Sequence, residues 1–487
     1  DLSEFSIKSV EVIELSSIKE KVLLTGTITN ESPLIIGTGK GSTVDTEVIL
    51  NEKGLPYIPA TSFVGALKHH LESEFKTTEA TKSIFGSGDS QSVLIVDDLY
   101  PIDAPDPKDA PVVTIRDGIK ISRLNGIAED KKKYDYELVE KGSKFNLCIE
   151  LTIREGQEDI ESSIFSLLAT VVSELESGAI TIGAMGSKGF GKITISDVKA
   201  YRFVFPEDGR KWLKYLEHGF TEDLTNLSVN LKKHPKLEKR DNSLLDIDAV
   251  FEIKNALMIG ASIIETGEDE DKDPDKTALT SREQFVLSGT ALKGAVRDRA
   301  VRIYNTVSGK HISGNEDPED IKELFGWVDE EGKESHKSKS RVRVTESYIN
   351  KETVHQERQP RIRLDRFTGG VASGALFETE PIWHKEEKIR VKIHVKKQKD
   401  KDSSWEVGLM LLVLKDLWSA DLPIGGEKSI GRGLLVGRQA RILVDGKEFE
   451  IEENEVGCLD IKGDRNIMEE YVSKFLEHVG RHEHAQN

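Results

Sequence analysis

The chain carries two copies of one set of short motifs, and this internal repeat constrains its fold more than any other feature of the sequence. Five blocks recur in the same order. They are LIIG (34–37) and LMIG (257–260), IPATSFVGALKHH (58–70) and LSGTALKGAVRDR (287–299), IFGS (84–87) and LFGW (324–327), GIKISRLNG (118–126) and RIRLDRFTG (361–369), and IGAMGSKGFGKI (182–193) and IGGEKSIGRGLL (424–435). Five ordered matches do not arise by chance, so we interpret the chain as a tandem duplication.

A charged, irregular segment separates the two halves. It runs over residues 228–246, and strand-like apolar periodicity resumes at IDAVFEI (247–253). We therefore expect a first domain over residues 1–235, a linker over 236–246 and a second domain over 247–487. The length of 487 residues also exceeds that of one ordinary hydrophobic core.

Each half shows the same order of expected elements. An apolar strand leads through a polar loop to a helix that we expect to begin at a threonine cap, Thr61 or Thr290. Further strands, a strongly apolar helix, a glycine-rich loop and a last strand follow. This order predicts an α+β chain of two tandem ferredoxin-like domains, similar to the RNA-recognition-motif sandwich. Residues 98–142 and 329–384 are too long for simple loops, so we expect a projecting thumb-like element in each half.

The net charge of −18 argues, taken alone, against binding to nucleic acid, because phosphate contacts need lysine and arginine. The charges are segregated, however. Acids concentrate in IETGEDEDKDPD (264–275), whereas residues 341–366 are rich in arginine. The composition therefore still allows an acidic protein with local basic strips that works as one subunit of a larger assembly.

Cysteine content and hydropathy indicate the compartment. The two cysteines, Cys148 and Cys458, lie far apart without the spacing of a zinc site, which is typical of a reducing cytoplasm. No apolar run is long enough to span a bilayer, and the start of the chain lacks the pattern of a signal peptide. We expect a cytoplasmic protein with no membrane partner.

The glycine-rich stretch IIGTGKGSTVDTEV (35–48) is not a nucleotide-binding loop. Lys40 stands between two glycines and is followed by glycine, so the Gly-Lys-Ser/Thr ending of a P-loop is absent. The next segment is strand-like, which also excludes a dinucleotide-binding turn. What remains is a loop with one lysine, Lys40, and one carboxylate, Asp45.

Together, the repeated motifs resemble those of the repeat-associated mysterious protein (RAMP) superfamily. More narrowly, SPLIIGTGKGSTVDTEVILNEKGLPYIPATSFVGALKHH, RDGIKISRLNGIA and GAMGSKGFGKI are similar to motifs of backbone subunits of type III CRISPR effector complexes. Two such domains in one chain resemble the fused double-backbone subunits of the type III-D branch. The resemblance implies three kinds of partner: a CRISPR RNA, a complementary target RNA and other RAMP subunits.

The resemblance also implies an activity. An aspartate in the loop after the first strand cuts the target RNA beside a kink that the thumb imposes at regular intervals. That aspartate is Asp45 in the first half and Asp275 in the second, with Asp273 and Asp271 as alternates because the second loop is longer. RNA supplies its own nucleophile, the 2′-OH, and a single carboxylate suits a hydrated Mg²⁺ or another divalent ion shared with RNA phosphates. The alternative interpretation of Asp45 is an ordinary solvated or loop-capping carboxylate that binds no ligand.

Nine cations are candidates for contacts with RNA. Helix starts with a nearby cation, and glycine loops that allow close approach of the backbone, both favour phosphate. The candidates are Lys40, Lys68, Arg123, Lys188, Lys192, Lys293, Arg297, Arg366 and Arg432. Each also has an ordinary structural interpretation: exposed helix residues, a tight turn without ligand, or an arginine paired with a buried carboxylate.

Two other functions remain open. The chain could be a scaffold that binds guide RNA without cutting, or a metal-independent RNA-processing nuclease that uses His69 and His70 as acid and base. Against the second alternative, the other half has Asp298 and Arg299 at those positions, and adjacent residues on a helix point in different directions.

Overall fold

The computed structural model describes residues 17–39, 41, 44–86, 88, 91–102, 110–261, 274–309, 316–328, 337–384, 388–454 and 459–484. The first half contains a four-stranded antiparallel sheet with the order β2-β5-β1-β6. The strands are β1 (Ile18–Asn30), β2 (Leu94–Val96), β5 (Lys144–Arg154) and β6 (Ile193–Val204). With two crossing helices this is the ferredoxin-like order, as the sequence predicts.

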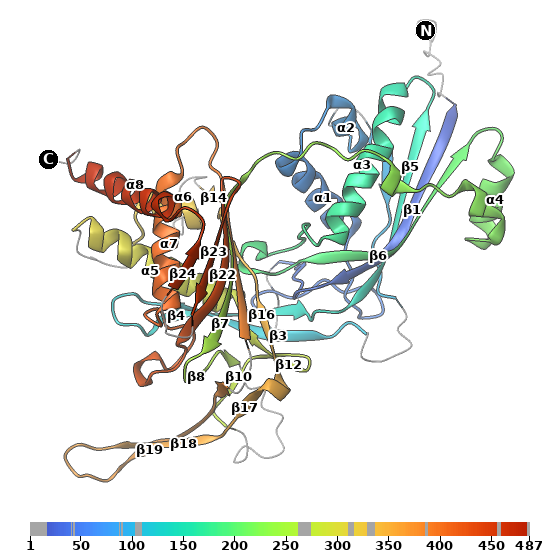
Figure 1. Cartoon of the computed structure of the whole chain (residues 1–487). Helices are drawn as coiled ribbons and strands as arrows, with labels where there is room; N and C mark the ends of the chain where they lie inside the picture. The colour runs from blue at the N-terminus through green and yellow to red at the C-terminus, as the bar shows by residue number, and fades with distance from the viewer. Residues whose placement is uncertain are drawn as a thin grey trace, which may run out of the picture.

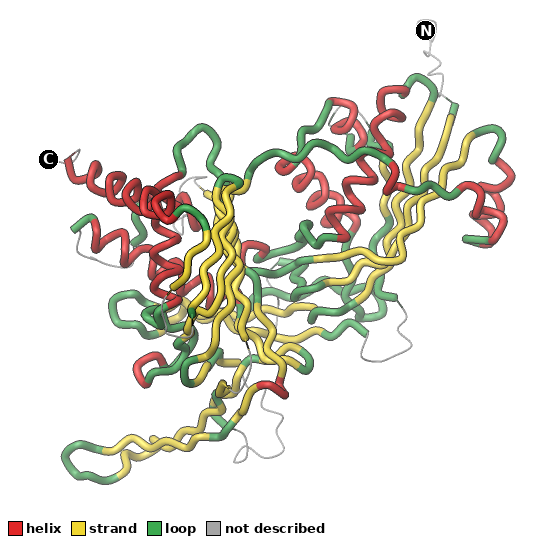
Figure 2. Tube along the Cα trace, in the orientation of Figure 1, coloured by secondary structure: helices red, strands yellow, loops and turns green. Residues whose placement is uncertain are grey.

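Alternation along β1 places helices on both faces of this sheet. Leu24 packs in the main core of the first half, whereas its neighbour Leu23 packs with Trp212 on the opposite face. The helices α1 (Ala60–Glu74), α2 (Glu79–Ile84) and α3 (Glu158–Glu176) lie on one side, and α4 (Gly209–His218) lies on the other (Figures 1 and 2).

The second half repeats this sheet and extends it. Its order is β15-β21-β7-β22-β23-β24, so two C-terminal strands lengthen the edge beyond β22. The strands are β7 (Ser243–Ile253), β15 (Val342–Val344), β21 (Lys388–Lys396), β22 (Leu435–Val444), β23 (Lys447–Glu453) and β24 (Leu459–Lys462). Its helices are α5 (Gly289–Val307), α6 (Glu319–Phe325), α7 (Ser404–Trp418) and α8 (Arg465–His484).

The strongly apolar helix expected near residue 410 is α7, and it belongs to the core. The helix α8 covers it, and Gly408 permits the close crossing, because a Cβ there would lie 2.2 Å from the backbone oxygen of Tyr471. Covering a leucine in this way contributes about 1.5–3 kcal/mol. No helix in the described ranges is long and apolar enough to cross a membrane.

A β-hairpin projects from each half, at the places expected to hold thumb-like insertions. The first is β3 (Val113–Ile121) with β4 (Ala128–Val139), and the second is β18 (Gln359–Leu364) with β19 (Val371–Glu380). Figure 1 shows the β18–β19 hairpin extending away from the rest of the molecule, whereas the β3–β4 hairpin reaches the second half, where Arg123 contacts Asp298.

Short strands and 3-10 turns connect these elements. The strands are β8 (Ala256–Leu257), β9 (Gly260–Ala261), β10 (Lys276–Ala278), β11 (Thr280–Ser281), β12 (Gln284–Leu287), β13 (Trp327–Val328), β14 (Lys337–Ser338), β16 (Ser347–Asn350), β17 (Val354–Gln356) and β20 (Ile382–His384).

The expectation of threonine caps is wrong. The helix α1 begins at Ala60 after Pro59 with no side-chain cap, and α5 is capped by Ser288, whose hydroxyl accepts from the N–H of Ala291, so neither threonine is the cap. The expected linker 236–246 contains the start of a strand and a backbone contact to the first half. The strand β7 already begins at Ser243, and the N–H of Arg240 donates to the carbonyl of Glu74 at 2.7 Å.

Candidate nucleic-acid interface

In the first half, the loop that carries Asp45 is hydrogen-bonded to the base of the β3–β4 hairpin. We call this loop, and the loop that carries Asp275 in the second half, the acidic loops. The backbone N–H of Asp135 donates to Oδ2 of Asp45 at 3.0 Å, and the N–H of Asp45 donates to Oδ1 of Asp135 at 2.9 Å. Thr46 then pairs in parallel with Tyr136. These bonds hold the exposed carboxylate of Asp45 beside β4.

The second half repeats this arrangement with Asp275. The N–H of Glu378 on β19 donates to Oδ2 of Asp275 at 2.6 Å. The next residue, Lys276, pairs in parallel with Thr379, as Thr46 pairs with Tyr136. The shared contact makes Asp275 the geometric counterpart of Asp45. The alternates Asp271 and Asp273, and also Lys40, lie outside the described residues.

Three of the predicted cations meet at the junction between the two halves. Lys293 on α5 is buried, and its Nζ donates to Ser187 at 2.8 Å and to Ser340 at 2.7 Å. Burial, and then the positive charges of Lys188, Arg297 and Arg343, lower the pKa of Lys293 to about 7. We call Lys188, Lys293, Arg297 and Arg343 the junction cluster. Mutual repulsion in this cluster would be relieved by an anion such as phosphate.

The comparisons with known proteins identify the fold of both halves. The model of the RAMP superfamily matches the chain twice, over residues 27–194 and 250–436. The chain belongs to the RAMP superfamily. It is also similar to the "CRISPR system Cms endoribonuclease Csm3" of Methanocaldococcus jannaschii, with 27% identity over 212 residues, which is 38% of this chain and 83% of that protein.

Two predicted cations of the RAMP domains, Arg297 of the junction cluster and Arg123, already have carboxylate partners within the chain. Arg123, at the tip of the first hairpin, contacts Asp298 through Nε at 3.2 Å and also pairs with Asp317. Nε of Arg297 donates to Asp317 at 2.7 Å. Of the two interpretations of Arg123, contact with RNA or pairing with a carboxylate of the chain, the structure shows the second.

The remaining candidates differ in exposure. Arg432 is buried and donates to Thr379, Gln359 and Glu427. Lys68 is half-buried with a carbonyl contact of 3.4 Å to Gly86, and Lys192 is half-buried in the glycine loop. Arg366, at the tip of the second hairpin, is exposed. Among the described candidates, Arg366 is thus the one most open to an external partner.

The glycine loops of the RAMP domains serve internal packing. Gly191 has a φ of +74°, and a Cβ there would lie 1.9 Å from the carbonyl oxygen of Ile182; Gly433 meets Ile424 in the same way. These two glycines are therefore required by the chain's own backbone. A tight turn without ligand is therefore enough to explain why glycine stands at both positions, without close approach of RNA.

The two adjacent histidines point to different neighbours. Nε2 of His70 lies 2.8 Å from a carboxylate oxygen of Glu174 on α3, whereas Nε2 of His69 lies 3.1 Å from Nζ of Lys339 in the second RAMP domain. Burial and the charges of Lys339 and Lys396 lower the pKa of His69. The pair does not form one acid–base site.

Sequence reasoning missed three groups of this region. The backbone N–H groups of Asp135 and Glu378 donate to the carboxylates of Asp45 and Asp275. No sequence motif marks these two residues, and only their position opposite the acidic loops in the structure identifies them. Arg343 joins the junction cluster from β15 and lies in the basic strip 341–366, which had already suggested local positive charge.

Proposed function

We propose that this chain is a CRISPR RNA-binding backbone subunit of a type III effector complex that cleaves complementary RNA at two places. The observation that carries the proposal is the repeated geometry of an exposed carboxylate bonded to the root of a projecting hairpin, Asp45 at Asp135 and Asp275 at Glu378. The name of the similar protein, an endoribonuclease of a CRISPR system, supports it.

The proposed chemistry uses groups that are present in the chain and in RNA. The 2′-oxygen attacks the adjacent phosphorus, the bond to the 5′-oxygen breaks, and the products are a 2′,3′-cyclic phosphate and a 5′-OH. Asp45 or Asp275 takes the proton of the 2′-OH, and water returns a proton to the leaving 5′-oxygen. A hairpin that kinks the RNA duplex beside the carboxylate would supply the in-line geometry.

The residues fit a divalent ion only if RNA completes its shell. Asp45 and Asp135 provide neighbouring carboxylates, but no group of three potential ligand residues is present in the described part of the chain. Mg²⁺ commonly keeps several waters and binds one or two carboxylates together with phosphates. Such an ion would stabilise the charge that develops on the phosphate.

The test is cleavage of a guide-complementary RNA by the reconstituted complex, with and without Mg²⁺. We compare the native chain with Asp45→Ala, Asp275→Ala and the double variant. Glu207→Gln, an exposed carboxylate between β6 and α4, is the matched control. Guide and target binding are measured for every variant.

Loss of one distinct product for each substitution, with RNA binding retained, would support two cutting sites on one subunit. An unchanged set of products would mean that other subunits cut and that this chain is a scaffold. Cleavage of repeat RNA by the isolated chain without a divalent ion would instead favour the processing-nuclease alternative.

A further inference from the structure

Two carboxylates of β4 accept hydrogen bonds from the acidic loop of the first half. Oδ1 of Asp135 accepts from the backbone N–H of Asp45 at 2.9 Å. Oε2 of Glu137 accepts from the backbone N–H of Val48 at 2.9 Å, and the N–H of Glu137 donates to the carbonyl of Thr46 at 2.9 Å. Side chains of the hairpin, and not only its backbone, therefore fix the course of this loop.

The core of the first domain decides where these two carboxylates point. Tyr136 and Leu138 are buried with Phe190 in one hydrophobic cluster. The rings of Tyr136 and Phe190 meet edge to face, with 6.2 Å between their centroids. Because successive side chains of a strand project to opposite faces, Asp135 and Glu137 point the other way, toward the acidic loop. Their direction is thus set by packing within the chain.

Asp45 and Asp135 form a reciprocal pair. Oδ2 of Asp45 accepts from the N–H of Asp135 at 3.0 Å, so each residue donates its N–H to the carboxylate of the other. The two bonds fix both the backbone and the side chain of Asp45, which remains exposed. Misplacement of a reacting group by about 1 Å can cost about 100-fold in rate, so the pair bears directly on the proposed cleavage.

The second half has the backbone bond without the reciprocal one. The N–H of Glu378 donates to Asp275, which makes Glu378 the counterpart of Asp135. The carboxylate of Glu378 pairs with Arg358 instead of accepting from the N–H of Asp275. Asp275 is therefore oriented at one end only by the hairpin beside it.

The next carboxylate of β19 is likewise bonded to another segment. Glu380 stands two residues after Glu378, as Glu137 stands two residues after Asp135. Oε2 of Glu380 accepts from Nε2 of Gln356 on β17 at 3.3 Å. Side chains on or just after β17 thus bind both carboxylates, and the second acidic loop pairs with β19 through the backbone.

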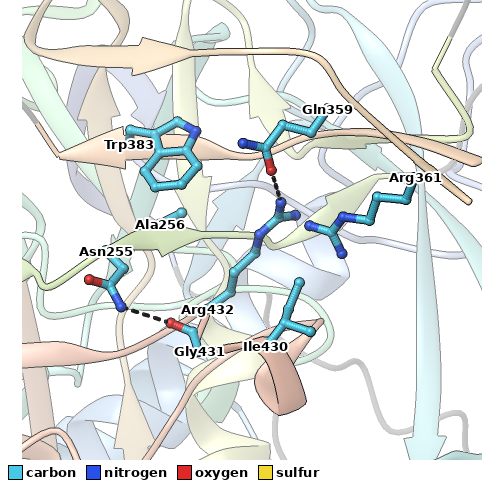
Figure 3. Close-up of a pocket in the computed structure, with 8 residues that line it drawn as sticks. All are labelled: Asn255, Ala256, Gln359, Arg361, Trp383, Ile430, Gly431 and Arg432. Carbon is cyan, nitrogen blue, oxygen red and sulfur yellow. Dashed lines mark hydrogen bonds between the residues drawn. The ribbon is translucent and has the colours of Figure 1, made fainter.

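The base of the second hairpin is also anchored differently. Thr379 stands where β4 has Tyr136, and its hydroxyl accepts from Nη1 of Arg432 at 3.2 Å. Figure 3 shows the guanidinium of Arg432 bonded to Gln359 on β18, with Arg361 beside it, in a pocket of about 250 Å³. Aromatic packing thus anchors the base of the first hairpin, whereas hydrogen bonds of an arginine anchor that of the second.

We propose that Asp135 is a positioning residue for cleavage at Asp45, and that no described side chain has this role at Asp275. The inference rests on the proposed function, because it takes Asp45 as the residue that accepts the proton of the 2′-OH. Asp135 acts through the N–H of Asp45 and touches no reacting atom. Its role requires an oxygen that accepts a hydrogen bond, and does not require its charge.

The first test measures single-turnover cleavage by the reconstituted complex and follows the product that Asp45→Ala removes. Asp135→Ala should slow formation of this product about 10- to 100-fold, while target binding and the other product stay unchanged. Asp135→Asn keeps an accepting oxygen and should restore the rate to within about threefold of the native chain. Asp117→Ala should cut like the native chain. It is the matched control, because Asp117 lies directly opposite Asp135 in the hairpin and its carboxylate pairs with Lys133 at 2.8 Å.

The second test needs no RNA and measures amide hydrogen exchange in the full chain, by mass spectrometry with fragmentation to single residues. Asp135→Ala should speed exchange at the N–H of Asp45 about tenfold or more, whereas Asp135→Asn should leave it near that of the native chain. Glu378→Ala should not change exchange at the N–H of Asp275, because the side chain of Glu378 pairs with Arg358.

Three results would overturn the inference. Native cleavage and native exchange in Asp135→Ala would show that the reciprocal pair does not position Asp45. Slow cleavage by Asp135→Asn with native exchange would show that the charge of Asp135 takes part in the chemistry. Loss of unfolding free energy or target binding in step with the cleavage rate would show a structural role only. An unchanged set of products from Asp45→Ala is a different result, which would overturn the proposed function and this inference with it.

Discussion

The carboxylate of Asp275 accepts a hydrogen bond of 2.6 Å from the backbone N–H of Glu378, one residue before the two segments pair as parallel strands. The contact repeats that of Asp45 with Asp135. In both halves, therefore, the acidic loop is bonded to the hairpin, and movement of the hairpin would carry the carboxylate with it. This coupling would keep the acid at a fixed distance from a kink in bound RNA.

Replacing Asp45 by asparagine should separate charge from position. Asparagine keeps an oxygen that accepts from the N–H of Asp135, so we expect the unfolding free energy to change by less than about 0.5 kcal/mol. Loss of a general base should slow cleavage at one place about 100-fold or more. Single-turnover cleavage and urea denaturation measure the two effects, and full cleavage by Asp45→Asn would exclude Asp45 as the base.

The buried Lys293 should make stability depend on pH. Its pKa falls to about 7 in the folded state, so between pH 7 and about 10 the unfolded chain binds more protons. Stability therefore rises with pH in this window, by at most about 1.4 kcal/mol per unit. The unfolding free energy of the native chain should therefore increase relative to that of Lys293→Met as the pH rises from 7 to 10. Lys53→Met, an exposed lysine, is the control, and a constant gap would contradict the prediction.

Gly189 and Gly431 form a matched pair that tests the contact between the two domains at Glu346. Both have positive φ, +92° and +81°, so alanine at either position costs about 1–2 kcal/mol of backbone strain. Only Gly189 faces the backbone of Glu346 at 2.7 Å, and overpacking there should cost about 1–3 kcal/mol more. Chemical denaturation of Gly189→Ala and Gly431→Ala measures the difference, and equal losses would argue against a fitted contact between the domains.

Neutralising Glu346 should destabilise the chain strongly. Glu346→Gln leaves Arg116 buried with only the distant carboxylate of Glu140, and we expect a loss of about 3–5 kcal/mol. Replacing both partners, as Arg116→Met with Glu346→Leu, should recover much of that loss. Asp98→Asn, at the equivalent place in the first half, should cost only about 1 kcal/mol. A loss no larger for Glu346→Gln than for Asp98→Asn would show that the ion pair contributes little.

The sequence alone was sufficient to predict the duplication, the ferredoxin-like order of each half and the two projecting elements. These features are local: alternation in β7, the apolar run of α7 and the repeated glycines are read within one segment. Asp275 could be aligned with Asp45 in the same way. The cap of α1 was misjudged because Pro59 ends the preceding segment and the helix begins without a side-chain cap.

The tertiary structure alone decided which equivalent residues have equivalent surroundings. Arg123 and Arg366 occupy matching motifs, yet one lies between two carboxylates of the other domain and the other is exposed. Lys293, expected to contact phosphate, is buried beside two hydroxyls. Motif and periodicity report the fold of each half, because that fold depends on neighbours in sequence. Burial and charge pairing depend on what the other half covers. Glu346 of the second domain lies against Gly189 of the first, whereas no described residue of the first half lies as close to Gly431, the counterpart of Gly189.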